Sequence, residues 1–179
     1  MQIPKHSKIL DLACGKGRHA VFLNKMGFEV LGLDLSEESI SQNKIFENDT
    51  LKFKVHDMRE AIYPKISKQK VDAVCNLFTS FGYFESDVED KKIFRSVADA
   101  LVDNGFFILD FLNEQWVKNT LVPKAITTKG DIEFHISKRI EDQHVIKDIN
   151  FKDQGEAFHF FEKVKLHTLE EIGSYAEEF

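Results

Sequence analysis

The chain has 179 residues, of which 42% are hydrophobic and 30% charged, a composition that predicts one folded domain and excludes a disordered chain. The formal net charge of −6 and the lack of a Lys/Arg run argue against nucleic acid as a partner. No apolar stretch approaches about 20 residues, so we expect no membrane span, and Cys14 and Cys75 fit a reduced, cytoplasmic protein.

Short apolar runs alternate with amphipathic stretches along the first two thirds of the chain. The apolar runs predict five strands, at 9–13, 29–34, 51–56, 71–78 and 106–112, the last after a turn at 103–105. The amphipathic stretches predict helices at 18–26, from a cap at Ser36 to about residue 46, and at 87–102. Residues 59–70 give only a weak helix signal. Strands this apolar are buried on both faces, so the alternation predicts a parallel sheet with helices on both faces.

The character of the sequence changes after about Trp116. Residues 131–143, 144–153 and 156–167 have an alternating component and are separated by turn residues at 141–142 and 154–155. This pattern predicts an antiparallel β meander after the fifth strand. Thr168 and Glu171 then form a capping box, which predicts a helix running to residue 179.

The loop between the first strand and the first helix, residues 11–20, is the most informative stretch. Gly15 and Gly17 allow a ligand to approach the backbone, and the start of the helix offers unpaired N–H groups. Asp34 ends the second strand, where a carboxylate can accept hydrogen bonds from both ribose hydroxyls. The Gly15-x-Gly17-x-x-Ala20 spacing also fits a dinucleotide, so an NAD-dependent oxidoreductase is an alternative.

Three further features favour a cationic nucleoside over a dinucleotide. Asp11 lies at the end of the first strand, where a carboxylate suits an ammonium or a sulfonium. Asp57 follows the third strand and can accept a hydrogen bond from an adenine amino group, while Met58 can pack on the ring. The fourth strand ends in a polar and aromatic stretch, residues 76–83, at the edge where open α/β sheets bind ligands.

Over residues 8–113 the sequence resembles the small-molecule branch of the class I S-adenosylmethionine-dependent methyltransferases. The resemblance implies an α/β fold with a Rossmann-like, mostly parallel sheet and S-adenosylmethionine as the cofactor. It also implies the cofactor-binding residues: Asp11, Ala13, Cys14, Gly15 and Gly17 around the methionine part, Asp34 at the ribose, Leu35, Asp57 and Met58 at adenine, and Asn76 and Leu77 beside the sulfonium. Ala13 stands where the family pattern D-x-G-x-G-x-G has a glycine. The family carries a helical segment before the first strand and two strands after a helix like that at Thr168, so we expect this chain to lack them.

The resemblance implies in-line methyl transfer to a small molecule by proximity and desolvation. His and Cys show no spacing typical of metal ligands, so we expect no metal, and no catalytic residue is assigned.

We expect a cofactor-binding core at 1–116, a substrate cover at 117–167 and a helix returning to the core at 168–179. The meander holds His135, His159 and His167, which are weaker candidates for a base. The substrate pocket candidates are Phe81, Tyr83, Phe111, Asn113 and Trp116. A non-catalytic, cofactor-binding relative is a further alternative, and the oligomeric state and methyl acceptor stay open.

Overall fold

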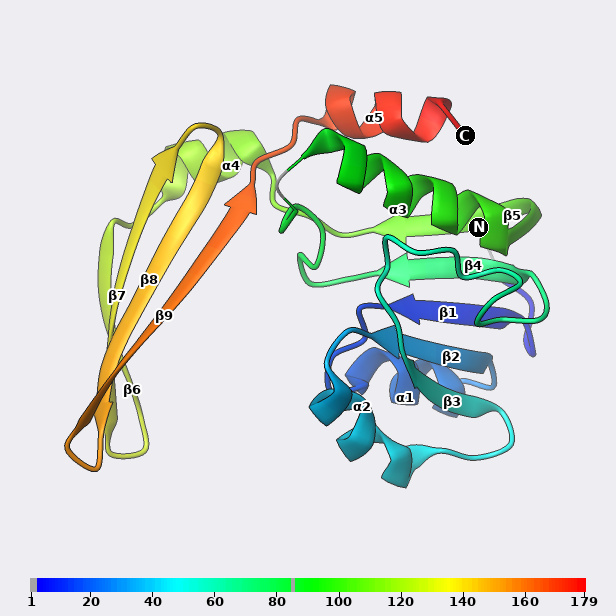
Figure 1. Cartoon of the computed structure of the whole chain (residues 1–179), viewed down its shortest axis with the longest axis horizontal. Helices are drawn as coiled ribbons and strands as arrows, with labels where there is room; N and C mark the ends of the chain where they lie inside the picture. The colour runs from blue at the N-terminus through cyan, green and yellow to red at the C-terminus, as the bar shows by residue number, and fades with distance from the viewer. Residues whose placement is uncertain (1–2, 85) are drawn as a thin grey trace. The chain divides into compact units, whose positions relative to one another are not determined.

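The computed structural model describes residues 3–84 and 86–179. These residues divide into two compact units, which are described separately. The first lies within Met1–Phe81, Glu85–Phe111 and Tyr175–Phe179, and the second within Gly82–Phe84 and Leu112–Ser174. The first unit contains the parallel sheet and the second an antiparallel sheet (Figure 1).

The first unit is built on a five-stranded parallel sheet in the order β3-β2-β1-β4-β5, which confirms the predicted Rossmann-like arrangement. Its arrows all point toward one edge in Figure 1, so the carboxyl ends of the strands lie side by side there. The fifth strand begins earlier than predicted: Leu101 pairs with Val71, and after a register shift around Asn104, whose φ is 62°, the pairing resumes between Phe106 and Ala73. The strands are β1 (Lys8–Leu12), β2 (Glu29–Asp34), β3 (Leu51–Val55), β4 (Val71–Asn76) and β5 (Leu101–Leu109).

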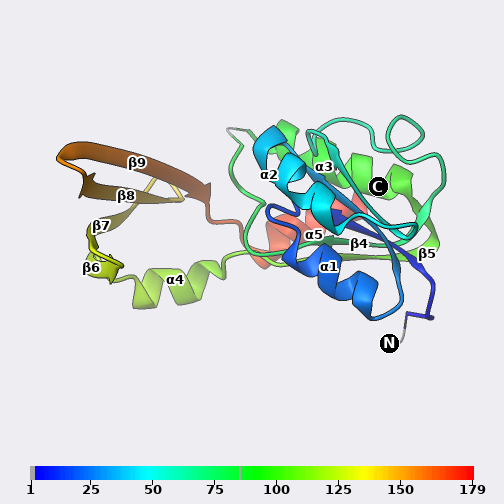
Figure 2. The same ribbon diagram turned by 90° about the horizontal axis from the view of Figure 1, so that it is seen from below.

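Helices cover both faces of this sheet (Figure 2). Helices α1 (Arg18–Lys25) and α2 (Glu37–Asn43) bury Ala20 and Ile40 in one apolar cluster with side chains of β1 to β4, and a short 3-10 turn, Lys44–Phe46, follows α2. On the other face α3 (Asp87–Ala100) places the Phe94 ring edge-on against three aromatic rings, so part of the high Phe content forms core. Their centroids lie 5.5–5.8 Å away, in Phe81, Phe107 and Tyr175.

The second unit contains a four-stranded antiparallel sheet in the order β6-β7-β8-β9. It confirms the predicted meander and adds an edge strand and a helix that were not predicted. The hairpin turn between β7 and β8 has positive φ at Asp142 and Gln143, one residue later than expected, while the turn at Gln154 and Gly155 is as predicted. The elements are α4 (Glu114–Thr120), β6 (Lys124–Lys129), β7 (Ile132–Glu141), β8 (His144–Asp153) and β9 (Glu156–Lys165).

The last helix, α5 (Leu169–Glu177), begins in the second unit and ends in the first. The predicted capping box is present: the Thr168 N–H donates to Glu171 Oε2 at 2.8 Å, and the Glu171 N–H donates to Thr168 Oγ1 at 3.1 Å. None of the helices in the described part of the chain is long and apolar enough to cross a membrane.

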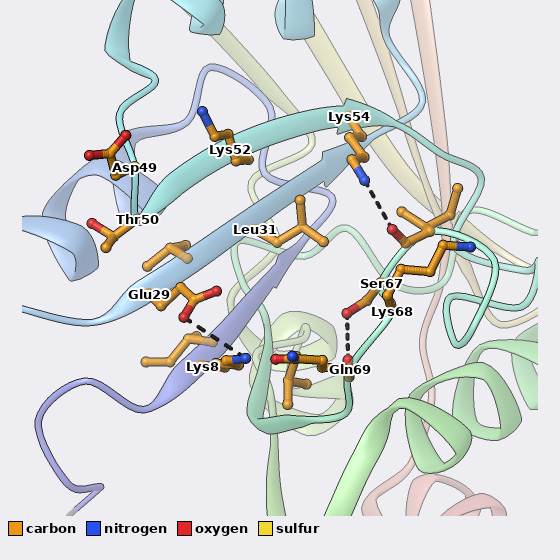
Figure 3. A pocket seen from close by; sticks show the side chains of 14 residues that line it. Lys8, Glu29, Leu31, Asp49, Thr50, Lys52, Lys54, Ser67, Lys68 and Gln69 are labelled. Atoms are coloured by element: carbon orange, nitrogen blue, oxygen red, sulfur yellow. Dashed lines mark hydrogen bonds and ion pairs between the residues drawn. The ribbon is translucent and has the colours of Figure 1, made fainter.

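A groove of about 370 Å³ lies in the first unit, around the amino-terminal ends of β1, β2 and β4 (Figure 3). Lys8 at its rim pairs with Glu29 at 4.0 Å, and the Lys54 ammonium donates to the Ile66 carbonyl at 3.0 Å. Leu31, which is half-buried, lines this groove, and residues 56–70, between β3 and β4, form no helix. None of the predicted cofactor-binding residues lines it.

Candidate cofactor-binding site

The predicted cofactor-binding residues come together at the carboxyl edge of the parallel sheet. Asp34 ends β2 and pairs in register with Val55, two residues before Asp57. On the other side of β2, Asp11 in β1 pairs with Cys75, and Asn76 follows directly at the end of β4. The sheet order β3-β2-β1-β4 therefore makes neighbours of residues that are far apart in the sequence.

Asp11 is a buried carboxylate, only 2% exposed. The backbone N–H of Ala20 donates to it, but Oδ2 has no partner among the described residues. Burial raises the pKa of Asp11 from 3.8 to about 7, the Ala20 N–H opposes this rise, and the negative charge of Asp34 adds to it. A cation bound beside this group would relieve its desolvation and favour the ionised form.

Asn76 provides a second buried oxygen at the same edge. Its Nδ2 donates to the Leu12 carbonyl at 3.1 Å and lies 3.8 Å from the Met58 sulfur, which fixes the orientation of the amide. Its Oδ1 is buried and has no partner among the described residues. Buried polar atoms are nearly always hydrogen-bonded, so these two acceptors at one edge are open to a donor, either a ligand group or a water.

The loop after β1 curls through three left-handed residues, Ala13, Gly15 and Gly17, with φ of 59°, 51° and 69°. A Cβ built on Gly15 would meet no atom within 4 Å, so open space lies beside the backbone at this residue. A Cβ on Gly17 would lie 3.0 Å from the Phe53 ring, so close packing adds to the preference for glycine that its φ already sets. The alanine at position 13 occupies a conformation that disfavours a side chain.

Two side chains hold this glycine loop in place. Asp34 Oδ2 accepts from the Gly15 N–H at 2.7 Å, and its Oδ1 accepts from the Ser36 N–H at 2.8 Å. Asn43 of α2 donates from Nδ2 to the Gly15 carbonyl at 2.7 Å, and it is 1% exposed. Sequence reasoning missed Asn43, although its position three residues after the buried Ile40 places a polar group on the buried face of the helix.

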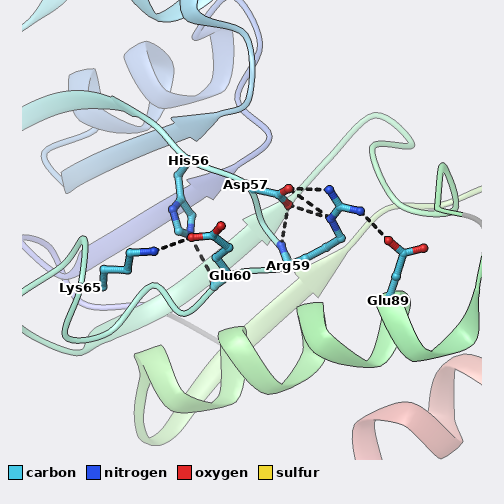
Figure 4. Close-up of polar contacts among 6 residues, drawn as sticks. All are labelled: His56, Asp57, Arg59, Glu60, Lys65 and Glu89. Carbon is cyan, nitrogen blue, oxygen red and sulfur yellow. Dashed lines mark hydrogen bonds and ion pairs between the residues drawn. The ribbon is translucent and has the colours of Figure 1, made fainter.

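Asp57 lies in a network that was not predicted (Figure 4). Its carboxylate accepts from Arg59 Nε at 3.0 Å and from Nη2 at 2.6 Å, and the second guanidinium arm reaches Glu89 Oε1 at 2.5 Å. The hydrogen bonds from Arg59 lower the pKa of Asp57, which keeps it ionised. Arg59 thereby orients Asp57, the residue predicted to bind the adenine amino group.

The remaining predicted cofactor residues differ in exposure. Leu35 is 65% exposed, while Met58 and Leu77 are half-buried. Cys14 is buried, and burial together with the charges of Asp11 and Asp34 raises its thiol pKa far above the ordinary value. A thiol that stays protonated is a packing group rather than a nucleophile.

Comparison with known proteins identifies the family. Residues 9–105 match the profile of a methyltransferase domain. The chain belongs to the methyltransferase domain family. It is 36% identical over 110 residues to YqeM of Bacillus subtilis, covering 60% of this chain and 43% of that protein. It is 25% identical over 182 residues to the Streptomyces venezuelae dTDP-3-amino-3,4,6-trideoxy-alpha-D-glucopyranose N,N-dimethyltransferase, covering 98% of this chain and 74% of that enzyme.

Solved structures share the fold of this methyltransferase domain. An S-adenosylmethionine-dependent methyltransferase from Clostridium acetobutylicum superposes with a TM-score of 0.81 at 22% identity, over 96% of this chain and 72% of that one. The sugar N-methyltransferase KedS8 from Streptoalloteichus gives a TM-score of 0.79 at 20% identity, over 98% and 72%. The chain thus spans less than half of the length of YqeM and about three quarters of the length of these two structures.

The substrate pocket candidates of the methyltransferase domain lie in both units. Phe81 is 2% exposed and packs against Phe94 in the first unit, which also contains the half-buried Phe111. Tyr83 and Trp116 are exposed in the second unit, where Asn113 caps α4 by accepting from the Trp116 N–H at 2.8 Å. That these residues line one pocket stays a prediction.

The histidines of the meander differ in their surroundings. His135 and His159 are exposed and pair with Glu133 at 2.8 Å and Asp148 at 2.9 Å, whereas His167 is 1% exposed.

Proposed function

We propose that this methyltransferase domain binds S-adenosylmethionine at the carboxyl edge of its parallel sheet and transfers the methyl group to a small molecule. The observation that carries the proposal is the buried Asp11 oxygen that has no partner among the described residues, beside a loop whose Gly15 faces open space. The residues present fit this cofactor because Asp11 suits its positive charge and Asp34 can accept from the ribose hydroxyls. The oxygen of Asn76 adds an acceptor at the same edge.

The bound cofactor supplies an electrophilic methyl group on a cationic sulfur. The contribution of the chain is to bind, orient and exclude water. The hydrogen bond from the Gly15 N–H to Asp34 joins the methionine-binding loop to the ribose-binding carboxylate. The groups that bind the two parts of the cofactor are therefore held in a fixed position relative to each other. Orientation of this kind contributes roughly 7–11 kcal/mol to such a displacement. A base is required only for a methyl acceptor that arrives protonated.

The methyl acceptor to test first is a small amine. Similar proteins include the N,N-dimethyltransferase of an amino sugar nucleotide and the glycine/sarcosine N-methyltransferase of Aphanothece halophytica, which is 30% identical over 109 residues. The role predicted for residues 117–167, that of a cover over the substrate, belongs to this proposal. A cytoplasmic location also belongs to it, because Cys14 and Cys75 are both free thiols.

The test is formation of S-adenosylhomocysteine by the purified chain, measured by mass spectrometry with glycine, sarcosine and amino sugar nucleotides as methyl acceptors. We expect product with at least one amine and a loss of activity in Asp34→Ala, with Asp103→Ala, an exposed carboxylate in β5, as the matched control. Binding of the cofactor without turnover would favour a non-catalytic relative. Failure to bind it at all would overturn the proposal.

A further inference from the structure

The turn that follows β4 has an unusual backbone. Phe78 and Thr79 are consecutive residues in the left-handed region, with φ of 63° and 57°, and neither is glycine. Side chains disfavour this conformation, so other contacts must hold it. The turn lies at the carboxyl edge of the sheet, two residues after Asn76, where β4 ends.

Asp110, the first residue after β5, supplies these contacts. Its carboxylate Oδ2 accepts from the Phe78 N–H at 3.1 Å, and its backbone carbonyl accepts from the Thr79 N–H at 3.2 Å. Its own N–H donates to the Asn76 carbonyl at 2.9 Å, which continues the pairing of β4 with β5. One residue thus contacts both strained positions and the strand end that precedes them.

The strained turn places an aromatic ring beside the start of α1. The Phe78 ring is 65% exposed, and its centroid lies 5.0 Å from the Arg18 guanidinium carbon and 5.0 Å from the His19 ring. Arg18 and His19 open α1 directly after the glycine loop. A cation held over an aromatic face loses rotational freedom, so Phe78 orders Arg18 beside the loop.

We propose that Asp110 is a positioning residue for cofactor binding, which fixes the Phe78–Thr79 turn and through Phe78 orders Arg18 at the methionine end of the site. This inference rests on the proposed function. It predicts that the acceptor oxygen of Asp110, rather than its charge, is what the turn requires, because the bond is made to a backbone N–H. It also predicts that removing the strain in the turn makes Asp110 less necessary.

The test measures the affinity for S-adenosylhomocysteine by calorimetry, which needs no turnover. In Asp110→Ala we expect affinity about five- to tenfold weaker than wild type, the effect of one lost hydrogen bond. Asp110→Asn keeps an acceptor oxygen and should bind within about twofold of wild type. Asp103→Ala is the matched control, since it removes an exposed carboxylate from β5 itself.

A double variant separates positioning from a general loss of structure. Adding Thr79→Gly to Asp110→Ala relieves the left-handed strain, so it should restore most of the lost affinity. Unchanged affinity in Asp110→Ala, weak binding by Asp110→Asn, or no rescue by Thr79→Gly would each overturn the inference while leaving the proposed function intact. Absence of binding by the wild-type chain would overturn both.

Discussion

Replacing Asp11 by asparagine should remove a pH-dependent destabilisation from the parallel-sheet unit. The pKa of Asp11 is raised by burial from 3.8 to about 7, so between these values the folded protein holds a proton that the unfolded chain has released. The contribution of Asp11 to the free energy of unfolding is therefore fully present below about pH 4 and is lost as the pH rises to about 7. Asparagine resembles the protonated carboxyl and does not titrate.

The size of the effect follows from the shift. Each pKa unit corresponds to about 1.4 kcal/mol, so a rise from 3.8 to about 7 corresponds to about 4 kcal/mol at most. Relative to wild type, Asp11→Asn should therefore gain up to about 4 kcal/mol of stability between pH 4 and pH 8. At pH 4 itself the two proteins should differ little, because Asp11 is then protonated in the folded state.

Urea unfolding of both proteins across this pH range checks the prediction. Circular dichroism is the suitable signal because the single tryptophan, Trp116, lies in the second unit and would not report on the parallel sheet. Asp103→Asn, which changes an exposed carboxylate, should show no such pH-dependent difference. A stability difference between Asp11→Asn and wild type that does not change with pH would refute the reasoning.

Three further substitutions test separate parts of the account. Ala13→Gly should stabilise the chain by about 0.5–1 kcal/mol in urea unfolding, since glycine relieves the left-handed φ of 59°, whereas Ala61→Gly should not stabilise it. Asp34→Asn keeps one acceptor oxygen but loses the charge, and it should weaken S-adenosylmethionine binding by about tenfold or more, with unchanged affinity contradicting the ribose assignment. Thr168→Ala breaks the capping box and should cost about 1 kcal/mol of stability, and a cost near zero would count against the cap.

The strands of the parallel sheet and the glycine loop could be predicted from sequence because their signals are local. Short runs such as 73–75 are apolar at consecutive positions, as in a strand buried on both faces, and the glycines around Gly15 indicate a tight loop by their type alone. The capping box at Thr168 could be predicted for the same reason, because it depends only on residues three positions apart. These signals also placed Asp34 and Asp57 at one edge, because the carboxyl ends of parallel strands meet there.

Other features depend on packing that no short segment encodes. Strand β6 is exposed along its whole length, so it shows no alternation, and α4 buries only Val117. Arg59 and Asp110 acquire their partners from the tertiary fold: Glu89 lies on α3, and the turn after β4 reaches Asp110 only because β5 pairs with β4. The sequence alone offers no sign of either contact.

The central claim is that the carboxylates at one sheet edge converge on a nucleoside with a cationic sulfur. Calorimetric titration of S-adenosylmethionine and of NADH into the wild-type chain tests it most directly. We expect saturable binding of S-adenosylmethionine with one site per chain and no binding of NADH. Binding of NADH with no binding of S-adenosylmethionine would contradict it.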